Sequence, residues 1–189
     1  MHSIRIGHRL DRSEIYGPGI RSVIWVQGCN LACKGCWNTQ FWNTTDGELI
    51  LVSDLLDEIG QIDGISGITI LGGEPLQQAN GVLELIQGCK KIGLHIFLYT
   101  GYNPDEFDST MQECFDLSDI VISGRYIESL RDTSLRWRGS LNQIIHYPQT
   151  KSICQDQIET TEIEFHLDTF GRLSVFGYPS ESLLEVGEI

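Results

Sequence analysis

The sequence predicts an α/β fold: a partial, open parallel β/α barrel with a C-terminal β-hairpin as an appendage. Three observations predict it. Short apolar runs rich in β-prone residues alternate with helical stretches, which is typical of parallel βα units. The chain has 189 residues, whereas a full eight-unit barrel typically needs about 250. Two alternating apolar and polar segments flank a turn close to the C-terminus, which predicts the hairpin.

Apolar runs mark the strands of the predicted core. The run at 22–26 is continuously β-prone, which indicates a strand buried on both faces. The other predicted strands comprise residues 67–71, 95–99, 119–122 and 142–146. The alternation alone leaves open a closed barrel, a partial barrel or a doubly wound sheet. In each of these, the reactive site is expected at the carboxyl ends of the strands.

Three stretches with helical spacing connect these strands. They comprise residues 53–60, 80–92 and 104–117. Ser53 is a favourable residue type at the start of the first helix, and Pro104 suits the first turn of the third. The hairpin is predicted from strands at 161–167 and 172–176, joined by the turn signal at 168–171 and with one face buried. We therefore expect a core at 1–150 and an extension at 151–189.

Charge and hydropathy exclude several classes of protein. Lysine and arginine number 13 and aspartate and glutamate number 26, which gives a net charge of −13. A non-specific nucleic-acid binder needs a basic surface, so no nucleic-acid partner is expected. No window approaches the 18 apolar residues of a membrane-spanning helix, and the N-terminus lacks the apolar run of a signal peptide. We expect a cytoplasmic protein without a membrane partner.

One segment departs from this acidic balance. Residues 125–138 contain four arginines and two acidic residues. Such a segment could face an anion, although basic segments of this kind are more often solvated loops.

The cysteines are the most informative residues. Cys29, Cys33 and Cys36 form a CxxxCxxC pattern, and Cys89, Cys114 and Cys154 are scattered. Without a secretory signal, a disulfide framework is not indicated, and three clustered thiols point to a metal. The scattered cysteines are expected to be buried apolar thiols.

Three interpretations of the cluster are open. The thiols could line one face of a packed helix, but Gly28, Asn30 and Gly35 are poor helix residues. A structural zinc ion takes four protein ligands, and no fourth lies nearby in the sequence. An iron–sulfur cluster suits soft thiolates, and three cysteines leave one iron of a four-iron cluster without a protein ligand. We favour the iron–sulfur cluster, with zinc as the alternative.

A second motif, GGEP at 72–75, follows the strand at 67–71. Glycines without Cβ atoms allow a ligand to approach the backbone, and Pro75 biases Glu74 towards an extended backbone. The Glu74 carboxylate could accept hydrogen bonds from an ammonium group. On its own, the motif could also be a tight turn between a strand and a helix.

With both motifs present, the sequence resembles the radical S-adenosylmethionine superfamily. Within it, the chain is most similar to the activating enzymes of anaerobic ribonucleoside-triphosphate reductases. The segments that carry this resemblance are 17–21 (GPGIR), 27–30, 36–38, 71–76, 99–102 (YTGY) and 138–143 (RGSLNQ).

The resemblance implies a set of site residues. Cys29, Cys33 and Cys36 are expected to hold a [4Fe-4S] cluster whose open iron binds S-adenosyl-L-methionine. The remaining expected cofactor contacts are Asn38 near the adenine, Gly72, Gly73, Glu74 and Pro75 at the methionine amino group, and Thr100, Ser123 and Arg125 at the ribose or the carboxylate.

The resemblance also implies a function. One electron cleaves the cofactor to a 5′-deoxyadenosyl radical, which takes a hydrogen atom from a glycine of a partner reductase; flavodoxin or ferredoxin is the expected electron donor. Thr39, where relatives carry proline, Ser123, where relatives often carry aspartate, and the hairpin motivate an alternative: a radical enzyme acting on a peptide or small metabolite. A non-catalytic iron–sulfur or zinc module is the alternative from another class.

Overall fold

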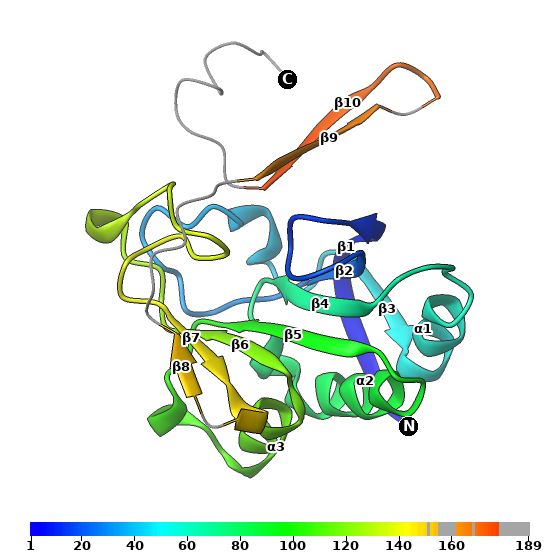
Figure 1. Ribbon diagram of the computed structural model, residues 1–189, viewed down its shortest axis with the longest axis horizontal. Coiled ribbons are helices and arrows are strands. Elements are labelled where there is room, and N and C mark those ends of the chain that lie inside the picture. Colours follow the sequence, from blue (N-terminus) through cyan, green and yellow to red (C-terminus); the bar gives the residue numbers. More distant parts are fainter. Residues whose placement is uncertain (151, 155–161, 168, 178–189) are drawn as a thin grey trace.

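The computed structural model describes residues 1–150, 152–154, 162–167 and 169–177 (Figure 1). Within them, eight strands form one sheet in the order β3-β1-β2-β4-β5-β6-β7-β8, and β9 and β10 form a hairpin. The sheet strands are β1 (Ser3–Ser13), β2 (Arg21–Val26), β3 (Glu48–Leu51), β4 (Gly67–Gly72), β5 (His95–Thr100), β6 (Ile120–Ser123), β7 (Ile144–Tyr147) and β8 (Ser152–Cys154). The hairpin strands are β9 (Ile163–Leu167) and β10 (Leu173–Gly177).

Three α-helices lie on one face of the sheet, and the hairpin lies on the other side of it (Figure 1). The helices are α1 (Val52–Ile59), α2 (Ala79–Lys91) and α3 (Ser109–Leu117). The short 3₁₀ helices are η1 (Thr39–Phe41), η2 (Pro75–Gln78), η3 (Pro104–Glu106), η4 (Glu128–Leu130) and η5 (Pro148–Thr150). No helix in the described ranges is long and apolar enough to span a membrane.

The centre of the sheet is parallel, as predicted. β2, β4, β5 and β6 pair in parallel, and α2 and α3 connect the last three of them. Every residue of β2 is buried, which explains its continuous apolar sequence. The α/β class and the C-terminal hairpin are therefore confirmed.

The outer strands are antiparallel, which the sequence did not predict. β1 pairs antiparallel with β2 and with β3, and β7 pairs antiparallel with β6 and with β8. The chain returns from β6 to β7 through residues 124–143, where η4 is the one helical element. A parallel return needs a crossover, usually a helix, so this segment brings β7 back in the opposite direction. The result is a mixed sheet with edges at β3 and β8.

Two sequence expectations need correction within the core. β1 and β3 were not predicted. In β1, Ile4 and Ile6 supply the buried apolar side chains, while arginines occupy neighbouring positions and interrupt the apolar pattern. The expected helix at 104–117 is divided into η3 and α3. Asp108 caps α3 by accepting a 2.8 Å hydrogen bond from the Met111 backbone N–H, which starts a new helix there.

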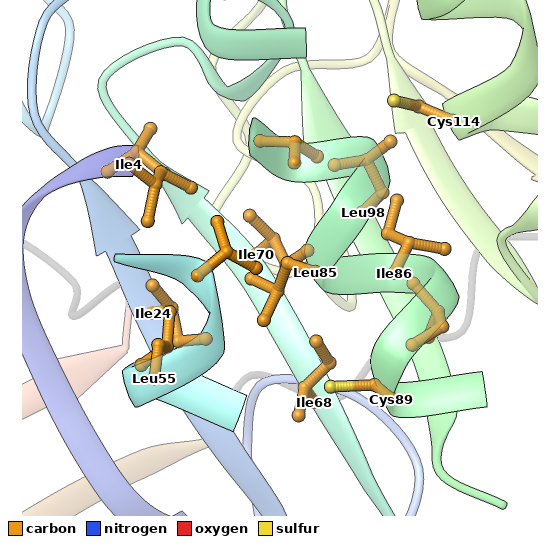
Figure 2. Packing of buried hydrophobic residues seen from close by; sticks show 14 of the residues in the cluster. Ile4, Ile24, Leu55, Ile68, Ile70, Leu85, Ile86, Cys89, Leu98 and Cys114 are labelled. Atoms are coloured by element: carbon orange, nitrogen blue, oxygen red, sulfur yellow. The ribbon is translucent and has the colours of Figure 1, made fainter. Parts of the chain in front are cut away.

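The core between the sheet and the helices is apolar (Figure 2). Ile24, Ile68 and Ile70 point from the sheet towards Leu85 and its neighbours on the helices. Because side chains alternate along strands, Val23, Trp25 and Leu71 face the other side of the sheet. That second face carries the site described below.

The scattered cysteines behave as predicted where they are described. Cys89 and Cys114 are fully buried in the core, and burial raises the pKa of each thiol to about 12. They are protonated core side chains rather than metal ligands. The side chain of Cys154 lies outside the described part of the chain.

Arg21 gives the GPGIR segment a structural role. Its fully buried guanidinium donates from Nε to the Thr69 hydroxyl (2.8 Å) and from Nη2 to the His95 carbonyl (2.9 Å). It also donates to the carbonyls of Pro18 and Ile68. One side chain thereby connects β2, β4 and β5, and burial lowers its pKa to about 10.

The hairpin packs on β1 and β2 through Phe176. This ring stacks on His8 at 5.8 Å between ring centroids and lies 6.0 Å from Trp25. The Gly177 backbone N–H donates to the Tyr16 hydroxyl at 2.9 Å. The apolar side chains of Phe165 and Leu167, on the opposite face of the hairpin, are 53% and 71% exposed. The expectation that the alternating apolar residues form a buried face is therefore wrong, since the half-buried Phe176 lies on the opposite face of the hairpin.

Candidate cofactor site

A cavity of about 580 Å³ lies on the sheet face opposite the helices. It brings together nine residues predicted from the sequence: Cys29, Cys33, Cys36, Asn38, Gly72, Gly73, Glu74, Pro75 and Thr100. These residues come from the carboxyl ends of β4 and β5 and from the segments that follow β2 and β4. Their convergence follows from the parallel strands, whose carboxyl ends share one edge of the sheet.

The cysteine segment is a loop held against its surroundings by backbone hydrogen bonds. The Cys29 N–H donates to the Trp42 carbonyl (3.1 Å), and the Cys36 N–H donates to the Cys33 carbonyl (3.1 Å). Ala32 has a positive φ of 47°, which a regular helix does not allow. The interpretation of three thiols on a packed helix is therefore excluded.

All three thiols are partly exposed to the cavity. Burial raises the pKa of Cys29 and Cys33, and neighbouring thiols reinforce the shift in both. Partial exposure is what a thiol needs in order to reach a ligand, in contrast to the closed environments of Cys89 and Cys114.

The two glycines of GGEP serve the packing of this loop. A Cβ atom on Gly72 would lie 2.5 Å from the Val26 nitrogen, and one on Gly73 would lie 2.3 Å from the Gly28 carbonyl oxygen. The Gly73 N–H donates to the Val26 carbonyl at 2.8 Å. The absence of Cβ atoms thus allows the GGEP and cysteine loops to touch, a reason that the sequence interpretation did not contain.

Glu74 is fixed at the centre of the site. Its side chain is 1% exposed, and its oxygens accept hydrogen bonds from the Leu76 N–H (2.9 Å), the Thr100 hydroxyl (2.8 Å) and the Gly101 N–H (2.7 Å). A carboxylate has about four acceptor positions, so one remains available. Burial, opposed by these hydrogen bonds, raises the Glu74 pKa to about 7. The carboxylate therefore connects the end of β4 to the end of β5.

Comparison with known proteins agrees with this arrangement. The sequence family described as "4Fe-4S single cluster domain" matches residues 15–146. The chain is 33% identical over 144 residues to the anaerobic ribonucleoside-triphosphate reductase-activating protein of Escherichia coli K12, covering 70% of this chain and 92% of that protein. The proteins of the same name from Vibrio cholerae and phage T4 are 36% and 34% identical, covering 90% and 85% of those proteins and 70% and 68% of this chain.

The chain belongs to this family of reductase-activating proteins. It is a radical S-adenosylmethionine family, and its cofactors are a [4Fe-4S] cluster and S-adenosylmethionine. Among solved structures, QueE from Escherichia coli superposes with a TM-score of 0.46 at 16% identity, covering 62% of this chain and 69% of that one. The hairpin β9–β10 lies outside the range matched by the family.

The residues present fit the family's cluster better than a single ion. In the described residues, no three His, Cys, Asp or Glu side chains are grouped closely enough to hold one metal ion. In a four-iron cluster each cysteine binds a different iron, so its ligands are spaced more widely than around one tetrahedral ion. Three partly exposed thiols around a cavity suit that wider spacing. This arrangement gives no support to the zinc alternative.

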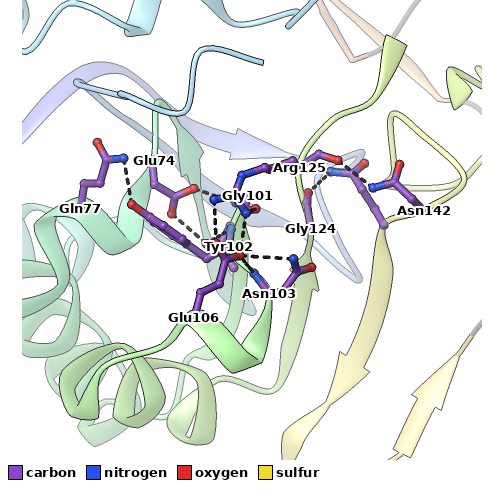
Figure 3. Close-up of polar contacts among 11 residues, drawn as sticks. Glu74, Gln77, Gly101, Tyr102, Asn103, Glu106, Gly124, Arg125 and Asn142 are labelled. Atoms are coloured by element: carbon purple, nitrogen blue, oxygen red, sulfur yellow. Dashed lines mark hydrogen bonds and ion pairs between the residues drawn. The ribbon is translucent and has the colours of Figure 1, made fainter. Parts of the chain in front are cut away.

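Two residues that were expected to contact the cofactor interact with other side chains instead. The buried Ser123 hydroxyl is 2.7 Å from Nε2 of His146. Arg125 forms a two-point ion pair with Glu106 at 2.6 and 2.8 Å, and its guanidinium lies 5.5 Å from the centre of the Tyr102 ring (Figure 3). Neither Ser123 nor Arg125 lines the cavity.

Other residues that line the cavity were not assigned to the site from the sequence. They include aromatic side chains from β1, β2 and the hairpin, and the Arg136–Trp137–Arg138 segment. The sequence signal for this segment was the excess of arginine over 125–138. The aromatic residues carry no such signal, because a buried aromatic position in a strand looks the same in a core and in a cavity.

Proposed function

We propose that this protein is an activase that installs a glycyl radical in an anaerobic ribonucleotide reductase. One observation carries the proposal: a single cavity unites the three thiols with the GGEP loop in a chain of the reductase-activating family. The relatives' name states that they activate the reductase, and 92% of the Escherichia coli protein is matched.

The chain's own residues have distinct tasks in this proposal. When bound, the reduced cluster supplies the electron that cleaves S-adenosylmethionine to methionine and a 5′-deoxyadenosyl radical. Cys29, Cys33 and Cys36 hold three of its irons. The free acceptor position of Glu74 receives the methionine ammonium group, and Asn38 lies beside the adenine. Thr100 holds Glu74 in place through its 2.8 Å hydrogen bond.

The surrounding fold supports access by a large partner. We infer that the sheet forms an open partial barrel, since no described strand joins the edges β3 and β8. An open side leaves room for a protein segment to reach the site at the carboxyl ends of the strands. Thiolate ligands require a reducing compartment, so we place the protein in the cytoplasm with flavodoxin or ferredoxin as its electron donor.

The proposal is tested by electron spin resonance. The anaerobically reconstituted protein is incubated with S-adenosylmethionine, dithionite and an anaerobic ribonucleotide reductase. We expect a glycyl radical signal, and none from a reductase whose radical-bearing glycine is replaced by alanine. Cofactor cleavage without any signal from the intact reductase refutes the partner.

A second candidate is a radical enzyme acting on another peptide or a small metabolite. It is favoured by Val175, Phe176 and Gly177, which line the cavity although the hairpin lies outside the family match. In both candidates we treat 1–150 as the core and 151–189 as an extension. Formation of 5′-deoxyadenosine separates both from a non-catalytic module, which forms none.

A further inference from the structure

The RGSLNQ segment holds one side of the cavity in a fixed position. The Gln143 side chain accepts from the Gly139 N–H (2.8 Å) and donates to the Gly124 carbonyl (3.0 Å). Asn142 donates to the Arg125 carbonyl (2.8 Å), as Figure 3 shows. These bonds attach the segment to the carboxyl end of β6, directly beside the cofactor site.

Three hydrogen-bond donors on this side have no partner in the described structure. They are Nε of Arg136, Nε1 of Trp137 and Nε of Arg138, all buried atoms of consecutive residues that line the cavity. Arg138 is only 6% exposed, and its one described bond runs from Nη1 to the Gln143 carbonyl at 3.1 Å. A buried donor without an acceptor costs about 1–3 kcal/mol, so three together indicate a ligand that supplies acceptors.

The backbone conformation of Trp137 also indicates a binding site. Its φ is 63°, a left-handed conformation that is unfavourable for a bulky residue. Such strain is concentrated at binding and catalytic sites. The ring itself is held by Phe97 at 5.2 Å and by the Arg136 guanidinium at 4.5 Å, measured to ring centres.

We propose that Arg136, Trp137 and Arg138 bind the backbone carbonyls of the partner segment that contains the radical-bearing glycine. This inference rests on the proposed function. Glycine has no side chain, so at the glycine itself only the peptide groups are available to accept hydrogen bonds. Three donors from consecutive residues match the repeated carbonyl acceptors of an extended peptide.

The neighbouring lining suits a peptide. Tyr16, Trp25 and Phe176 line the same cavity and offer aromatic surface to side chains. Arg136 and Arg138 are the only lysine or arginine residues in the described lining, and Glu162 lies 3.9 Å from Arg136. A partly balanced charge favours carbonyl acceptors over a multiply charged anion.

Three substitutions test the proposal with the fold retained. Trp137→Phe removes the indole N–H and keeps an aromatic ring, and Arg136→Gln removes a partly exposed guanidinium. Arg138→Lys keeps the charge and removes Nε. Arg9→Gln, which breaks an exposed ion pair with Glu58 outside the cavity lining, is the control. Thermal unfolding identifies any variant whose fold has changed.

The measurements separate the partner from the cofactor. For the reconstituted protein, we measure the Kd for the intact reductase by sedimentation, the Kd for S-adenosylmethionine, and partner-free formation of 5′-deoxyadenosine. Loss of one hydrogen bond predicts a reductase Kd that rises about 3- to 10-fold in Trp137→Phe, Arg136→Gln and Arg138→Lys. Cofactor affinity and partner-free cleavage stay at the wild-type level, and Arg9→Gln changes none of the three.

Each other outcome overturns the proposal. An unchanged reductase Kd in all variants, with the wild type active, overturns this inference alone. A weakened S-adenosylmethionine Kd assigns the donors to the cofactor carboxylate instead. If the wild-type protein cleaves S-adenosylmethionine but neither binds nor activates the reductase, the proposed function fails and this inference fails with it.

Discussion

At the scale of single residues, the Glu74 carboxyl group couples the site to pH. Burial raises its folded pKa from 4.5 to about 7, and Arg125 opposes this shift from nearby. The Cys29 thiol lies near Glu74, whose charge adds to the effect of burial in raising the Cys29 pKa. The folded pKa of Glu74 is higher than the unfolded one. The contribution of protonated Glu74 to the stability of the fold is therefore complete below about pH 4.5 and is lost as pH rises through 7.

We predict that Glu74→Gln removes this dependence. The stability advantage of the cluster-free wild type over Glu74→Gln should shrink by roughly 3 kcal/mol between about pH 4.5 and about pH 8, because glutamine does not titrate. Urea unfolding at both pH values measures it. An advantage that is constant or grows with pH would contradict the assigned direction of the shift.

The sequence identified site residues correctly where the chemistry of the residue type is specific. CxxxCxxC and GGEP identified seven cavity residues, because thiols and a glycine pair beside a carboxylate have few alternative uses. Ser123 and Arg125, like Thr100, were chosen because relatives contact the cofactor at these strand ends, and of the three only Thr100 lines the cavity. The other two side chains were free to find His146 and Glu106, which lie 23 and 19 positions away and cannot be identified locally.

At the scale of elements, the ring of Phe176 helps to hold the hairpin against the sheet. Phe176 is the hairpin ring that packs on His8 and Trp25, whereas Phe170 at the turn is 85% exposed. We predict that Phe176→Ala increases proteolysis and amide exchange at 163–177, since a half-buried ring contributes about 1–2 kcal/mol. Limited proteolysis with mass spectrometry measures the change.

The matched control is Phe170→Ala in the same hairpin, which should leave proteolysis at the wild-type rate. Equal effects of the two substitutions would show that the contact with β1 and β2 does not hold the hairpin.

Elements were predictable where the chain is locally repetitive. The parallel strands and their helices follow from apolar runs and helical spacing, and α2 begins and ends within a residue of the prediction. β1 was missed because its exposed positions carry arginines, and β7 was assigned to a parallel unit because strand direction is set by the connection rather than by the strand. The sequence pattern of the hairpin likewise did not show which of its faces meets the body of the protein.

At the scale of the whole molecule, Arg21 connects the three central strands. Replacing it with methionine removes a donor from the Thr69 hydroxyl and from the carbonyls of Ile68 and His95 in the interior. We predict that Arg21→Met lowers the free energy of unfolding by about 3 kcal/mol or more. Urea unfolding of the cluster-free protein measures this loss.

Arg9→Met is the matched control, because Arg9 forms an exposed ion pair with Glu58. Its loss should cost at most about 1 kcal/mol. Comparable losses in the two variants would refute the structural role assigned to the GPGIR segment.

The central claim is that three thiols hold a four-iron cluster with one iron open to S-adenosylmethionine. The direct measurement is electron spin resonance of the anaerobically reconstituted, reduced protein before and after S-adenosylmethionine is added. We predict a cluster signal that changes on addition, is lost in Cys33→Ala and is retained in Cys114→Ala. A protein without iron, or a cluster signal that S-adenosylmethionine leaves unchanged, would contradict the claim.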